Sequence, residues 1–86
     1  MRKNLSHFKA EVWSQTNCPA CTEAKRLLEQ RAITYVECMI GINGYSKKDL
    51  IKKIPDARSV PQIFLNGKYI GGLHELKKEL LEHDNN

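Results

Sequence analysis

The chain has 86 residues, of which 41% are apolar and 28% are charged, and its formal net charge is +4. This length allows one small domain with a modest core, and we expect residues 1–86 to form it. The lysines are interspersed with acidic residues and no arginine-rich run alternates with aromatic residues, so nucleic acid is not an expected partner. No apolar run is long enough to span a bilayer, and the basic N-terminus is not typical of a signal peptide. We therefore expect no membrane association and a cytoplasmic location.

The first half of the chain predicts a strand, a helix and a second strand. Residues 8–14 alternate with a period of two, which is the pattern of a strand with two distinct faces. After a polar loop, Pro19 suits the first position of a helix, and apolar residues spaced three and four apart continue to about Arg31. The β-branched and aromatic residues from 33 to 39 predict the second strand. Because the connections are short, the two strands should be parallel with a right-handed crossover.

A second helix is expected after a loop that contains two glycines. Ser46 and Asp49 have the spacing of a capping box, in which each side chain accepts a hydrogen bond from the other residue's backbone N–H. Pro55 disfavours helical geometry in the residue before it, so this helix should end near Ile54.

Two short strands and a last helix complete the chain. Residues 62–65 and 68–70 are apolar runs joined by Asn66-Gly67, the dipeptide most typical of a tight hairpin. The last helix should extend from residue 73 to about residue 82. Its expected buried stripe consists of four leucines: Leu73, Leu76, Leu80 and Leu81.

The order of these elements is βαβ, then α, then ββα. This order predicts an α/β fold in which a four-stranded mixed sheet is flanked by helices. That arrangement is a thioredoxin-like fold.

Cys18 and Cys21 lie between the first expected strand and the first expected helix. Asn17 or Cys18 should occupy the N-cap, where unpaired N–H groups and the helix dipole favour an anion, so we expect a lowered pKa for the Cys18 thiol. A thiolate is the form that attacks a disulfide. Cys21 lies one turn further on the same face and is placed to attack Cys18 in turn. The spacing therefore predicts thiol–disulfide exchange with Cys18 as nucleophile and Cys21 as resolving thiol.

Two other uses of this cysteine pair are structural zinc and simple burial in the core. Zinc would need two further ligands at a related spacing, and no second closely spaced pair of cysteines or histidines is present. An odd number of cysteines argues against a framework of structural disulfides. The third cysteine, Cys38, falls within an expected strand and should be a buried apolar residue.

Three motifs together resemble one family. They are Cys18-Pro19-Ala20-Cys21, the segment 59–64 that contains Val60-Pro61, and the double glycine Gly71-Gly72. In this order and spacing they resemble glutaredoxins, over residues 10–81. The resemblance implies a thioredoxin fold, a cis Val60–Pro61 bond that faces the thiols, and glutathione as reductant and cosubstrate, with no metal required.

The resemblance also implies a binding site for glutathione. The backbone of Val60, beside Pro61, would pair with its cysteinyl part. Arg58 matches a position that is often basic and would attract the glycyl carboxylate. Gln15 stands where the family commonly has a lysine or arginine, and its amide can still donate a hydrogen bond. The γ-glutamyl carboxylate would be bound by the backbone N–H groups at the start of the last helix, which belong to Gly72, Leu73 and His74.

The sequence differs from the family pattern at two further positions. Ala20 replaces the tyrosine that is common between the cysteines. His74 stands where an aspartate usually follows the double glycine, and Glu75 comes next.

The leading hypothesis is a monomeric, glutathione-dependent thiol–disulfide oxidoreductase that reduces protein disulfides and protein–glutathione mixed disulfides. Ribonucleotide reductase is a common client of the resembled family. Two alternatives stay open. One is a small electron donor that is reduced by thioredoxin reductase, and the other is a dimer that binds an iron–sulfur cluster through Cys18 and glutathione.

Overall fold

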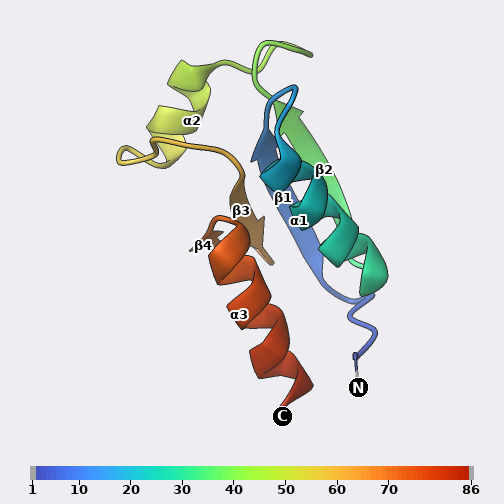
Figure 1. Ribbon diagram of the computed structural model, residues 1–86. Helices are drawn as coiled ribbons and strands as arrows, with labels where there is room; N and C mark the ends of the chain where they lie inside the picture. The colour runs from blue at the N-terminus through green and yellow to red at the C-terminus, as the bar shows by residue number, and fades with distance from the viewer. Residues whose placement is uncertain (1, 86) are drawn as a thin grey trace.

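The computed structural model describes residues 2–85 and contains four strands and three helices in this part of the chain (Figure 1). Every expected element is present, and the observed ends lie within two residues of the expected ones. In chain order the elements are β1 (Lys9–Ser14), α1 (Pro19–Gln30), β2 (Thr34–Met39), α2 (Lys47–Lys53), β3 (Gln62–Leu65), β4 (Lys68–Gly71) and α3 (Leu73–Asp84).

The strands form one mixed sheet in the order β2-β1-β3-β4. β1 is parallel to β2 and antiparallel to β3, and β3 is antiparallel to β4. The tight turn between β3 and β4 places Asn66 and Gly67 at φ values of 53° and 81°, as the hairpin dipeptide predicted. The expected thioredoxin-like fold with a four-stranded mixed sheet is confirmed.

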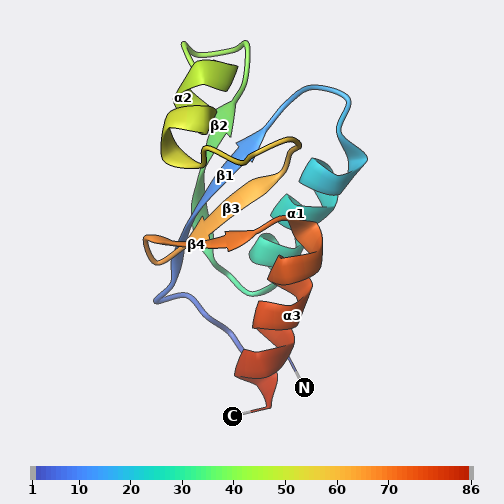
Figure 2. The same ribbon diagram turned by 90° about the vertical axis from the view of Figure 1, so that its left-hand side faces the viewer.

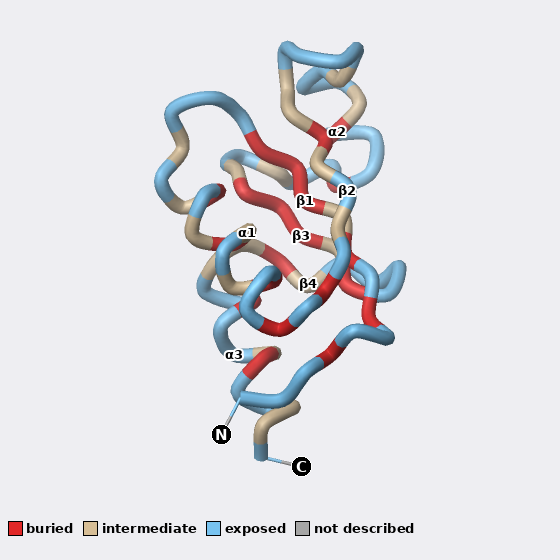
Figure 3. Tube along the Cα trace, turned by 90° about the vertical axis from the view of Figure 1, so that its right-hand side faces the viewer, coloured by how far each residue is buried: buried red, intermediate tan, exposed pale blue. Residues whose placement is uncertain are grey.

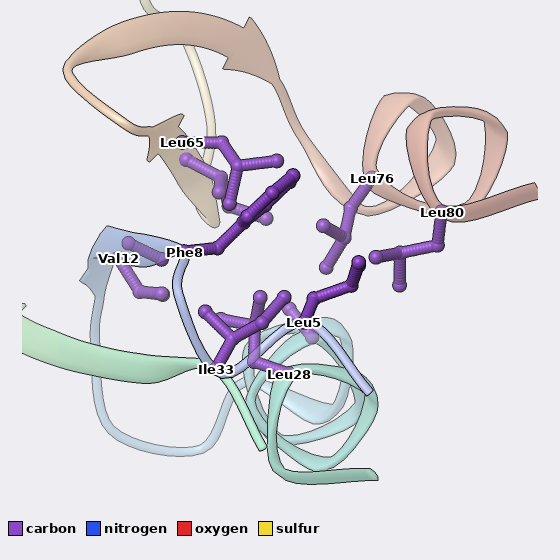
Figure 4. Packing of buried hydrophobic residues seen from close by; sticks show 11 residues of the cluster. Leu5, Phe8, Val12, Leu28, Ile33, Leu65, Leu76 and Leu80 are labelled. Carbon is purple, nitrogen blue, oxygen red and sulfur yellow. The ribbon is translucent and has the colours of Figure 1, made fainter. Parts of the chain in front are cut away.

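The main core lies between the sheet and helices α1 and α3. Figure 4 shows side chains from the strands, from both helices and from the N-terminal segment pointing toward one another. Val12, Leu28, Ile63 and Leu76 are fully buried in this cluster. The other buried members are Leu5, Phe8, Ala10, Ala24, Ile33, Leu65 and Leu80.

A smaller core lies on the opposite face of the sheet, where α2 packs (Figure 2). Trp13 from β1 and Cys38 from β2 pack there with Leu50 from α2 and with Ile54, the C-cap residue of that helix. Cys38 is 4% exposed, so its expected burial is confirmed. β1 and β3 are the strands buried along most of their length in Figure 3, because both faces of the sheet are covered where they run.

The expected stripe of α3 is wrong at one position. Leu76 and Leu80, four residues apart, are buried, and Leu73 packs partly buried against the main core. Leu81 is 60% exposed. Because adjacent residues of a helix point about 100° apart, Leu81 faces solvent when Leu80 faces the core.

The C-terminal end of α3 is fastened to the rest of the domain by Asp84. The carboxylate accepts two hydrogen bonds from the buried guanidinium of Arg31, at 2.9 and 2.7 Å, and a third from the backbone N–H of Lys3 at 3.1 Å. Arg31 is the C-cap residue of α1, so this contact joins the ends of both helices. No helix within residues 2–85 has the length and apolar character needed to cross a membrane.

Candidate active site

Cys18 is the N-cap residue of α1. β1 ends at Ser14, and the polar loop that follows reverses direction at Asn17, which has a φ of 54°. Cys18 itself is extended, with φ −122° and ψ 95°, and Pro19 begins the helix. A proline is well tolerated there because its missing N–H would have had no helical acceptor. The sequence therefore fixes the start of α1 so that the sulfur of Cys18 lies over the first turn.

Cys18 and Cys21 form a disulfide across this first turn, with a Cα–Cα distance of 5.2 Å. The backbone N–H of Cys21 donates to Cys18 Sγ at 3.1 Å. Cys21 is 2% exposed, whereas Cys18 is half-buried. The two cysteines thus differ: Cys18 is partly accessible and its sulfur receives a backbone donor, whereas Cys21 is enclosed.

The loop before β3 lies against the cysteines. The Val60–Pro61 bond is cis, as the resemblance implied, and Pro61 is buried. The carbonyl oxygen of Val60 lies 3.8 Å from Cys18 Sγ. Figure 2 shows this loop and the loop after β1 at the same end of the sheet. The side-chain amide of Gln62 donates to the carbonyl oxygen of Ser59 at 2.8 Å, which holds the loop in place.

A cavity of about 340 Å³, here called the proline-loop cavity, opens beside this loop. Three of the predicted site residues, Gln15, Arg58 and Val60, line it. Lys47 is a second cation in the lining, and Ile40 and Ile51 give the cavity an aliphatic wall. Its lining includes Gln15, Ile40, Lys47, Ile51, Arg58 and Val60.

The double glycine leads into α3, and Gly72 is the N-cap residue of that helix. The N–H of Gly72 donates to the Glu75 carboxylate at 2.8 Å, and this bond lowers the pKa of Glu75 below its ordinary value. Gly71 has a φ of 118°, and a Cβ there would lie 2.7 Å from Cγ of Glu75, so a side chain at this position would be strained and crowded. Of the three expected N–H donors at this end, the one of Gly72 is therefore engaged by Glu75.

The remaining predicted residues lie near this helix start. Leu73 packs partly buried against the main core, and His74 is exposed. Gly72 is close to the proline loop, because a Cβ on it would lie 3.2 Å from the carbonyl oxygen of Pro61. The structure thus places Gln15 and Val60 next to Cys18, Arg58 with them in the proline-loop cavity, and the start of α3 next to Pro61.

Sequence reasoning missed a second cavity, of about 500 Å³, that contains both cysteines and is here called the cysteine cavity. Lys25, a charged residue of α1 outside the apolar spacing, lines this cavity. The available signal was its position four residues after Cys21, which puts both on one face of the helix. The lining of the cavity includes Gln15, Asn17, Cys18, Cys21, Lys25 and Met39.

Zinc was an alternative use of the cysteine pair. Across residues 2–85, no group of three or more histidine, cysteine, aspartate or glutamate side chains gathers in a way that would hold a metal ion.

The chain is similar in sequence to known proteins. A family model described as glutaredoxin matches residues 10–70. The chain is 38% identical over 84 residues to the mitochondrial glutaredoxin-2 of Pongo abelii, an alignment that covers 92% of this chain and 52% of that protein. It is 34% identical over 92 residues to glutaredoxin 1 of Rickettsia prowazekii, with 96% of each protein covered. The chain thus spans about half the length of the mitochondrial relatives that it matches.

Two solved structures resemble this fold. Reduced Escherichia coli glutaredoxin aligns with a TM-score of 0.78 at 27% identity, covering 91% of this chain and 99% of that one. A buckwheat glutaredoxin–glutathione complex aligns with a TM-score of 0.66 at 26% identity, covering 95% of this chain and 74% of that one.

A thioredoxin-like fold with a cysteine pair at the start of α1 defines a class, the dithiol proteins of the thioredoxin fold. Within that class, the family match and the relatives show that this chain belongs to the glutaredoxin family.

Proposed function

We propose that this chain is a glutathione-dependent thiol–disulfide oxidoreductase in which Cys18 is the nucleophile and Cys21 the resolving thiol. The observation that carries the proposal is the position of Cys18. Its sulfur receives the Cys21 N–H at 3.1 Å at the N-cap of α1, and its disulfide partner lies one turn further on. Backbone donors and the helix dipole stabilise a thiolate at this position, which is the reactive form of the side chain.

Reduction of a protein disulfide then takes two exchange steps on the enzyme. The Cys18 thiolate attacks one sulfur of the client disulfide, forms a mixed disulfide with it, and releases the other client sulfur as a thiolate. Cys21 loses its proton and attacks Cys18 Sγ, which releases the second client sulfur and leaves the Cys18–Cys21 disulfide. Two glutathione molecules reduce that disulfide and become glutathione disulfide.

A protein–glutathione mixed disulfide requires Cys18 alone. The Cys18 thiolate takes the glutathionyl sulfur and releases the client thiolate. A second glutathione then attacks this mixed disulfide, which yields glutathione disulfide and regenerates Cys18. Cys21 takes no part in this route, so the two reactions separate the roles of the two thiols.

Glutathione as the reductant is supported by family membership and by the surroundings of Cys18. The similar buckwheat glutaredoxin was solved as a glutathione complex. In this chain, Arg58 and Gln15 line the proline-loop cavity next to Val60, whose carbonyl oxygen lies 3.8 Å from Cys18 Sγ. A tripeptide with two carboxylates would find the Arg58 cation there and, if it displaces the Glu75 side chain, the N–H of Gly72 at the start of α3.

The proposal is tested by disulfide reduction with two alternative electron sources. Glutathione with glutathione reductase should support the reaction, and thioredoxin reductase alone should not. Cys18→Ser should abolish reduction of a protein disulfide and also of a protein–glutathione mixed disulfide. Cys21→Ser should lose protein-disulfide reduction and keep reduction of a glutathionylated protein, while the control Cys38→Ser should retain both activities. Activity with thioredoxin reductase alone, or activity in Cys18→Ser, would contradict the proposal.

We also propose that the protein acts as a monomer in a reducing compartment, for which the cytosol is the candidate, and that its clients are proteins with accessible disulfides. Ribonucleotide reductase is the client class to assay first. Light scattering of the purified protein tests the monomer, and localisation of a tagged chain in its source organism tests the compartment.

A further inference from the structure

The resolving thiol of the proposed reaction is in an unfavourable place for a charge. Cys21 is 2% exposed. Burial in apolar surroundings disfavours a thiolate, yet Cys21 must become one to attack Cys18. The inference that follows rests on the proposed function and concerns what stabilises this buried thiolate.

The cysteine cavity contains one candidate. Of the side chains that line it, only Lys25 carries a charge. Gln15 lines the same cavity and is neutral. Lys25 follows Cys21 by four residues on α1, and residues at this spacing have Cβ atoms about 5–6 Å apart on one face of a helix.

The ammonium group of Lys25 is held by Glu37 on the edge strand β2, and Glu37 is in turn held by Ser14 on the neighbouring strand β1. Lys25 Nζ donates to Glu37 Oε2 of β2 at 2.8 Å, and the hydroxyl of Ser14 at the end of β1 donates to the same oxygen at 2.6 Å. Ser14 is fully buried, so this anchor is fixed. Glu37 does not line the cysteine cavity, so Lys25 is the member of the pair that lines the same cavity as the two cysteines.

The hydrogen bonds of Glu37 also favour its charged form. Partial burial by itself would raise the pKa of Glu37, but the hydrogen bonds from Lys25 and Ser14 outweigh it and lower that pKa below its ordinary value. The negative charge of Glu37 also helps to raise the pKa of two other titratable groups on β2. They are Tyr35, whose hydroxyl donates to Glu29 of α1 at 2.8 Å, and Cys38 on the opposite face of the sheet.

We propose that Lys25 is the cation that stabilises the Cys21 thiolate in the resolving step, and that Glu37 and Ser14 are the positioning residues that hold its ammonium group beside the cysteine cavity. In that step the Cys21 proton passes to solvent and the Cys21 thiolate forms a bond to Cys18 Sγ. The bond between Cys18 and the client sulfur breaks, and its electron pair leaves with the client sulfur. Lys25 keeps its proton throughout and acts through its charge.

The test titrates Cys21 directly. In a Cys18→Ser, Cys38→Ser background, Cys21 is the only thiol, and the ultraviolet absorbance of its thiolate is followed against pH. Lys25→Met should lower the thiolate-to-thiol ratio of Cys21 at a given pH by about threefold or more, because a nearby cation is lost. Lys25→Arg should restore most of the ratio.

Glu37→Gln should act in the opposite direction. The glutamine oxygen can still accept from Lys25 and Ser14, but it no longer neutralises the ammonium charge. The thiolate-to-thiol ratio should therefore rise. A residue that only supports the local structure would not give opposite shifts in the two variants.

Arg26→Met is the matched control. Arg26 is the next residue of α1 and pairs with Glu23 at the surface, so the same charge is removed away from the cysteine cavity. It should change the ratio less than twofold. Lys25→Gln replaces Lys25→Met if the methionine variant does not fold.

Equal effects of Lys25→Met and Arg26→Met, or shifts of the same sign in Lys25→Met and Glu37→Gln, would overturn the proposal. The titration uses no glutathione and no client. A failed reductase assay would therefore count against the proposed function alone, and an unchanged titration would count against the role of Lys25 alone.

Discussion

The three cysteines of this chain differ because of their local surroundings. Cys18 has a backbone donor and partial exposure, and Cys21 is enclosed next to a cavity that contains Lys25. Cys38 is buried under α2, and this burial raises the pKa of its thiol, with the negative charge of Glu11 adding to the shift. Reactivity should follow these differences, since the thiolate is the reactive species.

Cys38 should be inert in the folded protein. In a Cys18→Ser, Cys21→Ser variant it is the only thiol, and it should react with a thiol-specific disulfide reagent only after denaturant is added. The reaction is followed by the absorbance of the released chromophore in native buffer and in urea. Rapid, stoichiometric reaction in native buffer would contradict the burial argument.

The residue scale also shows where sequence reasoning reached its limit. The position of Cys18 follows from local signals, namely a strand end, a polar loop and Pro19, so it was predictable. The ion pair between Lys25 and Glu37 joins a helix to a strand twelve residues later in the chain. No local sequence pattern predicts such a contact. The hydrogen bond from Gly72 to Glu75 has the spacing of a capping box and could have been predicted. The motif is hard to recognise because the N-cap residue is a glycine, which has no side chain to complete the box.

At the scale of single elements, α2 depends on its capping box. The hydroxyl of Ser46 accepts from the N–H of Asp49 at 3.2 Å, and the Asp49 carboxylate accepts from the N–H of Ser46 at 3.0 Å. Ser46→Ala should lower the free energy of unfolding by about 1 kcal/mol, because a helix N–H loses its acceptor. Urea denaturation measures this change.

Ser6→Ala is the control for that experiment, since Ser6 lies in an exposed turn before β1. Hydrogen exchange should show faster exchange confined to α2 in Ser46→Ala. An unchanged midpoint together with unchanged exchange in α2 would show that the capping box contributes nothing to the fold.

The end of α3 should give the protein an acid-sensitive contact. Partial burial by itself would raise the pKa of Asp84, but hydrogen bonds from the N–H of Lys3 and the guanidinium of Arg31 outweigh it and lower that pKa. A group whose pKa is lower in the folded state stabilises the fold fully above its unfolded pKa, and this contribution is lost as the pH falls through the lower value.

Asp84→Asn should therefore destabilise the protein at pH 7, and the difference from the wild type should shrink as the pH falls below the ordinary pKa of an aspartate, about 3.9. Chemical denaturation at several pH values measures the difference. A constant difference between neutral and strongly acidic pH would mean that the Asp84 charge is not the stabilising feature.

At the scale of the whole molecule, the order of elements, the parallel and antiparallel pairings and the hairpin all followed from periodicity and turn chemistry. The choice among the leucines of α3 did not. The sequence shows Leu76, Leu80 and Leu81 as equally apolar, and only the way α3 packs on the sheet and α1 exposes Leu81. The contact of Arg31 with Asp84 spans 53 positions and likewise depends on the assembled fold.

This difference between leucines predicts two very different mutants. Leu76→Ala should lower the free energy of unfolding by about 2–5 kcal/mol, because it leaves a cavity in the fully buried main core. Leu81→Ala should change it by less than about 0.5 kcal/mol. Denaturant titration of both variants measures the contrast, and comparable losses in the two would contradict the packing of α3 described above.

The central claim is that Cys18 is the thiol that attacks disulfides and accepts the glutathionyl group, and that Cys21 acts only as the resolving thiol. The most direct measurement is mass spectrometry of the reduced Cys21→Ser variant after incubation with glutathione disulfide, with the modified peptide mapped. One glutathione per chain, attached to Cys18, is the expected result. Attachment to Cys38 instead, or equally rapid attachment to Cys21 in the Cys18→Ser variant, would contradict the claim.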